Sequence, residues 1–322
     1  MPRPGDGRRH LMFLYAPRSL VDPDLRHDNA CIGQAVSDDL VTWTRLPDVV
    51  LPGPAGAVDD HATWTGSVVR APDGRWHLYY TGVTCLDGFY LQRVCRAVSD
   101  DGVTWHKDGK PVLSADPRWY AVAGENAWPD EHWRDPWVFA DPGGDGWHCL
   151  VTARARPEQW PDEHVDDLGV IGHAWSADLH RWEARPPLSS PGSGFGHLEV
   201  PQVVEVDCRW CLVFSCLHGE LAPSRRDAGA TGGHWLVADV HPTGPYDTAR
   251  AVPLTDDTLY AGRILAGDAG QPVLVAFDNR WTTDCGGTLV DPLDVVLDTA
   301  AVLGAPPPLR RPREGYGTAP TS

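Results

Sequence analysis

The sequence contains very little lysine and no long apolar stretch. Its two lysines are Lys107 and Lys110, and its 27 lysines and arginines face 44 acidic residues, for a formal net charge of −17. Such an acidic surface repels phosphate backbones and anionic lipid headgroups, so we expect no nucleic acid or membrane partner. No run reaches the roughly 18 apolar residues of a membrane span, and the first residues lack the apolar core of a signal peptide. We therefore expect a cytoplasmic protein.

The eight cysteines show no arrangement typical of a metal site. The one local cluster is Cys208, Cys211 and Cys216. In an extended strand Cys208 and Cys211 point to opposite faces, and no second C-x-x-C follows. We expect reduced, mostly buried thiols, no metal and, since no glycine-rich phosphate loop is present, no cofactor.

The sequence also lacks any sustained helical period, and short apolar runs between turn residues are typical of β strands. A turn followed by an apolar strand recurs five times, as DGRRHLMFLY (6–15), DGRWHLYYTG (73–82), DGWHCLVTAR (145–154), DCRWCLVFSC (207–216) and AGQPVLVAFD (269–278). A repeat of roughly 65 residues that cannot bury both faces of its own sheet must stack on copies of itself. The pattern predicts an all-β, five-bladed β-propeller over residues 1–303, followed by a Pro-rich, disordered tail at 304–322.

A second repeat consists of a strand end, an acidic turn and a tryptophan, as in AVSDDLVTW (35–43), AVSDDGVTW (97–105) and AWSADLHRW (174–182). The strand before each repeated turn is predicted to line the central channel, namely TGSVV (65–69), DPWVF (135–139), EVPQVV (199–204) and AGRIL (261–265). Their first residues should converge at one mouth. Asp135 and Glu199 are then acids at equivalent positions of successive blades, or else strand caps paired with arginines such as Arg134.

Tryptophan is abundant, at 15 copies. Such rings line sugar-binding surfaces, although packing between sheets explains most of them. The inserts 120–132 and 156–167, rich in Trp, Pro and acidic residues, are predicted to be long loops over one face, as a lid or as plain surface.

These segments resemble the invertase and levanase family of glycoside hydrolases and its five-bladed furanosidase relatives. The segment 10–47 is similar to the first blade of that family, TWTGSVV (63–69) to a sugar-contacting strand, WRDPWVF (133–139) to an Arg-Asp-Pro motif, and LEVPQVV (198–204) to a Glu-Cys-Pro motif with Val200 replacing cysteine. The resemblance covers residues from about 10 to 300.

The resemblance implies roles for individual residues. Glu199 matches the general acid/base, and Asp135 matches the carboxylate that stabilises an oxocarbenium-like transition state. Six residues are expected to contact a small-molecule or oligosaccharide substrate, with packing as the alternative role: Trp64, Thr65, Arg134, Trp137, His197 and Asp60.

Two departures from the family pattern stand out. The family nucleophile is an aspartate on the innermost strand of the first blade, and the repeat spacing places that strand before Met1, so the usual nucleophile is expected to be missing. Asp22 is predicted to be a loop residue, whereas Asp59 and Asp60 are weak substitutes. The family's C-terminal β-sandwich is also expected to be absent.

Three functions remain open at this point. The first is a furanosidase acting on a fructoside or an arabinoside. The second is a propeller used for other acid/base chemistry, as a lyase, isomerase or cyclase in specialised metabolism, which needs no covalent intermediate. The third is a carbohydrate-binding protein without catalysis.

Overall fold

The computed structural model describes residues 7–17, 19, 20, 22–124, 128, 130–206, 209–239, 241–267, 269–280 and 287–295. The expected tail at 304–322 and two cysteines, Cys208 and Cys285, lie outside these residues. The six cysteines within them are free thiols, four of them buried. The burial of four of the six agrees with the expectation of mostly buried thiols.

Antiparallel strands form five sheets, and in the first four each strand pairs with the next one along the chain. Blade 1 contains β1 (Arg9–Tyr15), β2 (Cys31–Ser37) and β3 (Thr44–Val50). Blade 2 contains β4 (Ala62–Arg70), β5 (Trp76–Leu86), β6 (Phe89–Ser99) and β7 (His106–Leu113). Blade 3 contains β8 (Trp133–Ala140), β9 (Trp147–Arg154), β10 (Gly169–Ser176) and β11 (Glu183–Arg185).

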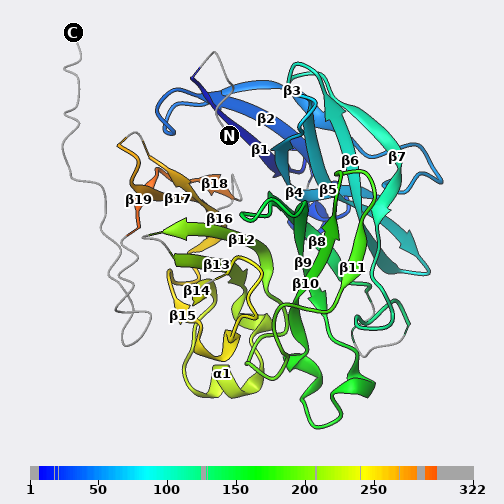
Figure 1. The fold of residues 1–322 in the computed structure, drawn as a ribbon, viewed down its shortest axis with the longest axis vertical. Coiled ribbons are helices and arrows are strands. Elements are labelled where there is room, and N and C mark those ends of the chain that lie inside the picture. The colour runs from blue at the N-terminus through cyan, green and yellow to red at the C-terminus, as the bar shows by residue number, and fades with distance from the viewer. Residues whose placement is uncertain are drawn as a thin grey trace.

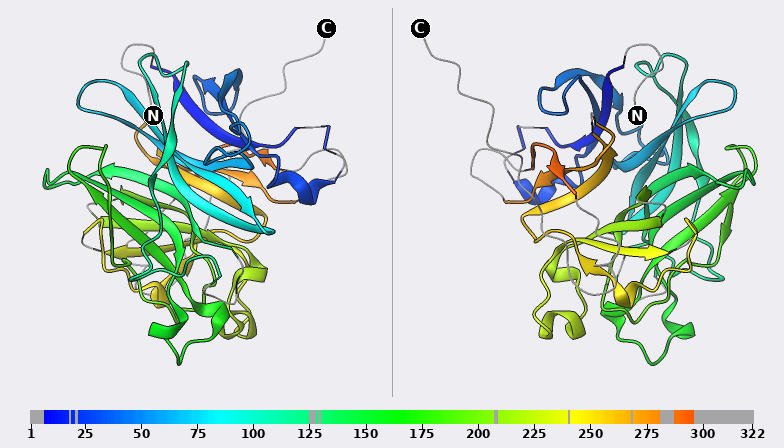
Figure 2. Two further views of the ribbon diagram at one scale, coloured as in Figure 1. Left: turned by 90° about the vertical axis from the view of Figure 1, so that its right-hand side faces the viewer. Right: turned by 60° about the vertical axis from the view of Figure 1, so that its left-hand side comes forward.

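The last two blades follow the same plan. Blade 4 contains β12 (Glu199–Val206), β13 (Arg209–Cys216), β14 (Gly233–Asp239) and β15 (Val252–Pro253). Blade 5 contains β16 (Leu259–Ala266), β17 (Pro272–Asp278), β18 (Thr288–Leu289) and β19 (Leu293–Asp294), with both short strands paired to β17. The sheets succeed one another around a common centre, and blade 5 returns beside blade 1 (Figures 1 and 2). The predicted five-bladed propeller is confirmed.

The acidic turn of the second repeat joins β2 to β3 in blade 1, β6 to β7 in blade 2 and β10 to β11 in blade 3. In blade 1 the Asp39 carboxylate accepts hydrogen bonds from the backbone amides of Val41 and Thr42 at 2.9 and 2.7 Å. These amides lower the pKa of Asp39 to about 2. Asp101 and Asp178 accept the same pair of bonds in blades 2 and 3. The repeated aspartate therefore satisfies turn amides, as is typical of an Asx-turn.

The first strands of successive blades lie against one another at the centre, where β4 contacts β8, β8 contacts β12 and β12 contacts β16. This confirms the predicted inner strands of blades 2 to 5. In blade 1, β1 corresponds by its sequence repeat to the second strands β5, β9, β13 and β17. Within the described residues β1 pairs only with β2, and all seven of its residues are half-buried.

A β-bulge interrupts each inner strand near its start. The register shifts after Trp64 in β4, Arg134 in β8, Glu199 in β12 and Tyr260 in β16. These four bulge residues occupy one register position, because their partners on the next strand are the equivalent residues Thr81, Thr152, Ser215 and Phe277. We call the end of the channel formed by these four bulge residues the mouth.

The bulges correct one sequence-based expectation. Glu199 is equivalent to Arg134, and Asp135 is equivalent to Val200, so the two acids do not occupy equivalent positions. The residue after the bulge start has a left-handed backbone in three blades, with φ of 60° at Asp135, 50° at Val200 and 52° at Ala261. A bulge adds an unpaired residue to one strand, and an apolar pattern does not reveal where that residue lies.

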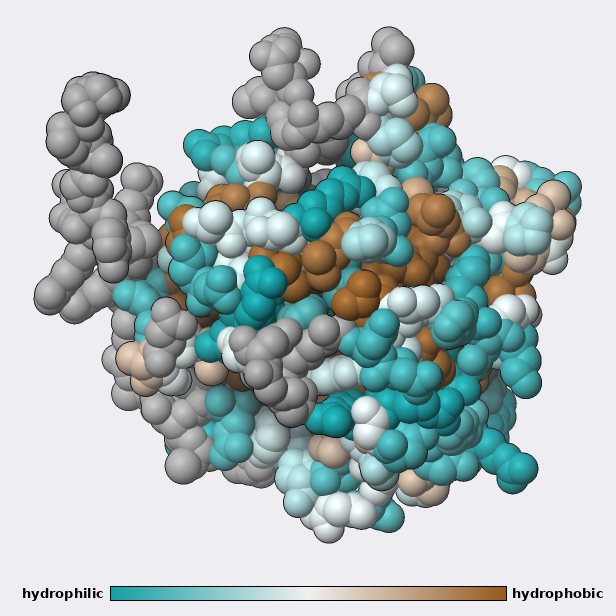
Figure 3. Space-filling view, turned by 90° about the horizontal axis from the view of Figure 1, so that it is seen from above, coloured by the Kyte–Doolittle hydropathy of each residue, from teal (hydrophilic) through white to brown (hydrophobic). Residues whose placement is uncertain are grey.

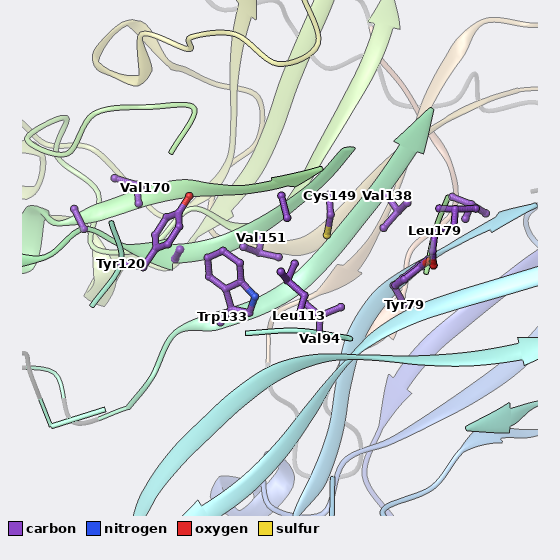
Figure 4. Packing of buried hydrophobic residues seen from close by; sticks show 14 of the residues in the cluster. Tyr79, Val94, Leu113, Tyr120, Trp133, Val138, Cys149, Val151, Val170 and Leu179 are labelled. Atoms are coloured by element: carbon purple, nitrogen blue, oxygen red, sulfur yellow. The ribbon is translucent and has the colours of Figure 1, made fainter. Parts of the chain in front are cut away.

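The largest apolar cluster lies between blades 2 and 3 (Figure 4). Trp133 at the start of β8 is fully buried, and its ring meets the edge of Tyr120 at 4.7 Å between centroids. Val94, Val151 and Val170 belong to the same cluster. This packing fixes the position of the neighbouring residue Arg134.

We expect Trp133→Ala to lower the free energy of unfolding by about 3–5 kcal/mol, because it removes a large buried ring and leaves a cavity. Urea titration followed by fluorescence measures the change. Trp160→Ala is the control: Trp160 is 36% exposed, so its loss should change stability by less than about 0.5 kcal/mol. Equal effects of both substitutions would contradict the assigned packing.

Seen from above, the molecule presents a mainly hydrophilic face, with apolar residues gathered in a band across its middle (Figure 3). The α-helix among the described elements, α1 (Pro223–Asp227), has five residues, and short 3-10 turns supply the other helical segments. In this part of the chain we find no helix with the length and apolar character needed to cross a membrane.

Candidate active site

Arg134 occupies the centre of the mouth, and its side chain is 8% exposed. Its guanidinium contacts Glu199 Oε1 at 2.5 Å through Nη2 and Asp135 Oδ2 at 3.5 Å through Nε. Both acids therefore pair with Arg134, as the alternative expectation stated. This shared partner brings the two carboxyls close to each other. Burial acts to lower the pKa of Arg134, but Glu199 and Asp135 outweigh it and raise that pKa.

The same guanidinium fixes the protonation of two histidines. Arg134 lies 2.8 Å from His132 Nδ1 and 3.1 Å from His197 Nδ1. A guanidinium only donates, so both Nδ1 atoms accept and each ring carries its proton on Nε2. Burial, reinforced by neighbouring positive charge, lowers the pKa of both histidines well below the usual value. Both rings are therefore neutral.

Asp135 is held from three sides. Its carboxylate accepts hydrogen bonds from the Thr65 hydroxyl, from Thr152 Oγ1 at 2.8 Å and from the Val200 amide at 3.2 Å. Its own amide donates to Thr81 Oγ1 at 2.9 Å. Blades 2, 3 and 4 thus fix one carboxylate, and these bonds offset the cost of its left-handed backbone.

Glu199 is 7% exposed, and the groups around its carboxyl differ from those around Asp135. The Tyr260 hydroxyl donates to its Oε2, and Arg134 donates to its Oε1. Burial raises the pKa of Glu199, and the neighbouring Glu220 raises it further, against the effect of Arg134. A buried carboxyl with a raised pKa keeps its proton to higher pH than usual, which suits it to act as a general acid.

Glu220 is a third carboxyl at the mouth that the sequence did not indicate. It ends the 3-10 turn His218–Glu220 after β13. Its Oε1 lies 3.3 Å from His197 Nδ1, and its carboxyl reaches Glu199. Burial is the main cause that raises the pKa of Glu220. Tyr260 was also missed, because the predicted inner strand 261–265 begins one residue after it.

Three of these side chains could hold a metal ion by spacing alone, since ligand atoms of His197, Glu199 and Glu220 lie within 4.8 Å of one another. However, the Arg134 guanidinium already contacts Glu199 Oε1 and His197 Nδ1. A metal ion would have to displace this buried cation. We therefore assign no metal to the cluster.

The other predicted substrate contacts separate into two groups. Thr65 and His197 lie at the mouth through their contacts with Asp135 and Arg134. Trp64 is a bulge residue of the mouth by its register, but its indole is directed to the blade 1 loop, where Nε1 donates to the His27 carbonyl at 2.9 Å and the ring meets Tyr90. The Trp137 ring lies below Arg263, 5.0 Å from the guanidinium carbon.

The proposed substitutes for a nucleophile have structural contacts instead. Asp59 is buried against Lys107 Nζ at 2.8 Å and the Tyr80 hydroxyl at 2.7 Å. Asp60 accepts the Gly56 amide at 2.7 Å and so holds a loop. Asp22 is an exposed residue before the 3-10 turn Pro23–Arg26, as its predicted loop position requires.

The two inserts meet over the mouth. The Trp128 indole donates to Asp166 Oδ1 at 3.1 Å, which joins the segments 120–132 and 156–167. The Trp128 ring also lies 4.5 Å from the His197 ring, centroid to centroid. The prediction that both inserts lie over one face agrees with these contacts.

Comparison with known proteins identifies the family to which the chain is similar. The profile described as "Glycosyl hydrolases family 32 N-terminal domain" matches residues 5–285. Sucrose-6-phosphate hydrolase of Bacillus subtilis (strain 168) is 28% identical over 194 residues, which are 60% of this chain and 34% of that protein. Beta-fructofuranosidase 1 of Zea mays is 35% identical over 197 residues, 58% of this chain and 26% of that protein. The chain matches about a third of the length of these relatives.

Solved structures agree on the fold. The inulosucrase from Halalkalicoccus jeotgali bound to kestose superimposes with a TM-score of 0.68 at 21% identity, covering 95% of this chain and 87% of that one. The Bombyx mori beta-fructofuranosidase BmSUC1 gives a TM-score of 0.66 at 23% identity, covering 90% of this chain and 57% of that one. The expected resemblance to invertase-type propellers is confirmed. The chain belongs to glycosyl hydrolases family 32, whose N-terminal domain it matches.

Proposed function

We propose that the protein hydrolyses β-fructofuranosides, with Glu199 as general acid/base and Asp135 as stabiliser of the transition state. One observation carries this proposal: Arg134 holds both carboxyls at the mouth while their surroundings differ. Asp135 accepts three hydrogen bonds in addition to its ion pair. Glu199 is buried, and its pKa is raised. Glycoside hydrolysis requires one carboxyl that donates a proton and a second that faces the developing positive charge, and these two surroundings suit those roles.

The proposed chemistry follows from these settings. Glu199 donates its proton to the leaving glycosidic oxygen, and the Asp135 carboxylate faces the positive charge that develops on the sugar ring. Asp135 is already fixed before the reaction, so it needs no reorganisation when that charge appears. The fructoside preference rests on the names of the relatives, which include a sucrose-6-phosphate hydrolase and a beta-fructofuranosidase.

The proposal is tested by incubating the protein with sucrose, kestose and inulin, and separately with 4-nitrophenyl α-L-arabinofuranoside. We expect release of free fructose and no release of nitrophenol. Proton NMR of the first product then reports whether the anomeric configuration is retained or inverted, which decides whether a covalent intermediate forms.

Other outcomes would favour the other functions. Saturable binding in calorimetry without any product would favour a carbohydrate-binding protein. Consumption of a sugar without an equivalent amount of free fructose would favour a lyase, isomerase or cyclase. Glu183→Gln is a suitable control for charge in all assays, because Glu183 lies on the outer strand β11 with its side chain 64% exposed.

A further inference from the structure

The carboxyl of Glu220 accepts a hydrogen bond at Oε2 from the Leu217 amide at 3.3 Å, while its Oε1 faces His197 Nδ1. The charged or titratable groups around it come from several elements and are Asp135, Arg134, Arg154, His197, Glu199, Cys216 and Tyr260. Of the three arginines near the mouth, Arg134 contacts carboxylates directly. Arg154 and Arg263 donate instead to backbone carbonyls, Gly196 O at 2.7 Å and Val200 O at 2.6 Å.

The charges at the mouth favour a retained proton. Asp135, Glu199 and Glu220 would together carry three negative charges if all were ionised. Arg134 contacts Asp135 and Glu199 directly, whereas Arg154 and Arg263 act on Glu220 and Asp135 only through the longer-range attraction of charges. The histidines beside them are neutral and add no positive charge. The neighbouring Glu220 carboxyl raises the pKa of Glu199, because one ionised carboxyl disfavours the ionisation of another beside it.

The contacts of Glu220 indicate which carboxyls hold the retained proton. His197 Nδ1 accepts from Arg134, so it has no hydrogen to offer the Glu220 oxygen 3.3 Å away. Glu199 and Glu220 also face each other with acceptor oxygens, within 4.8 Å. The contact between the two carboxyls becomes favourable when Glu220 and Glu199 hold a proton between them.

We propose that Glu220 is a positioning residue for Glu199: the two carboxyls share one proton, and the sharing keeps Glu199 in the form that donates to the leaving group. This inference rests on the proposed function for its catalytic meaning. Glu220 and Glu199 belong to one blade and lie beside the same histidine. A nucleophile must instead be ionised and face the acid across the substrate, so Glu220 does not suit that role.

The test is the pH dependence of kcat/KM for Glu220→Gln, with Glu183→Gln as the matched loss of one charge. Removing the like charge lowers the pKa of Glu199, so the protonated donor is lost at lower pH. We expect the alkaline limb of the profile to move about one pH unit toward acid. Turnover of Glu220→Gln should fall at neutral pH and recover in acid. Glu220→Asp keeps a carboxyl beside Glu199, so its profile should lie between those of Glu220→Gln and the wild-type protein.

A second readout does not depend on turnover. Infrared difference spectroscopy with ¹³C-labelled glutamate detects the carbonyl band of a protonated glutamate. The band that disappears in Glu199→Gln is assigned to Glu199. In Glu220→Gln this band should titrate about one pH unit lower than in the wild-type protein. If no sugar is hydrolysed but the band shifts, the proposed function fails while the shared proton stands.

Two results would overturn the inference. The first is a kcat/KM profile and an infrared titration that both match those of Glu183→Gln. The second is loss of turnover by Glu220→Gln at every pH together with rescue by azide, which would identify Glu220 as the nucleophile.

Discussion

Glu199→Gln is expected to lower kcat for sucrose hydrolysis by about a thousandfold, because an amide cannot donate the proton that the leaving oxygen needs. The amide oxygen can still accept the bond from Arg134, and the amide nitrogen can donate to the Tyr260 hydroxyl. The melting temperature should therefore stay close to that of the wild-type protein. Initial rates of fructose release and thermal unfolding measure the two effects.

Leaving-group chemistry separates this role from others. A 4-nitrophenyl β-fructofuranoside has a leaving group that departs with little protonation, so Glu199→Gln should slow its hydrolysis far less than that of sucrose. Equal losses with both substrates would show that Glu199 does not supply the proton. An unchanged rate with sucrose would remove Glu199 from the site altogether.

Asp135→Asn is expected to lower kcat by about a hundred- to a thousandfold while KM changes little, because a neutral amide no longer stabilises the positive charge of the transition state. Steady-state kinetics on sucrose provides both constants. The amide keeps one acceptor for the Thr152 and Val200 donors, so a modest fall in stability is also expected.

The matched control is Asp60→Asn. Asp60 holds the Gly56 amide in a loop, and its replacement by asparagine should leave both kinetic constants close to wild type. If Asp135→Asn raised KM with kcat intact, Asp135 would contribute equally to substrate and transition-state binding. If neither constant changed, its carboxylate would serve only to join blades 2, 3 and 4.

Sequence reasoning recovered the blades because their repeat is local. The turn aspartates Asp39, Asp101 and Asp178 form contacts within a few residues, so a short motif contains the full structural reason for them. The inner strands were recovered for the same reason. The exact residue that reaches the mouth was harder to predict, because each bulge shifts the register without changing the apolar pattern, and Tyr260 was missed by one position.

Glu220 and Asp59 show a second limit. Glu220 lies in a 3-10 turn outside both repeats, and only its contact with His197 reveals its place. Asp59 comes just before β4 in the sequence, yet its partner Lys107 lies on β7. In both cases the deciding contact joins residues far apart in the chain, and neither composition nor spacing contains that information.

The bulges place a different side chain at the same backbone position in each of four blades. Trp64, Arg134, Glu199 and Tyr260 share one register position while differing in size, charge and proton affinity. Beneath three of them, the hydroxyl-bearing residues Thr81, Thr152 and Ser215 preserve a layer of small polar side chains. Mutation can therefore alter one bulge side chain while the strand pairing beneath it stays the same. A new activity could therefore be engineered on this scaffold by substituting the bulge residue in any of blades 2 to 5.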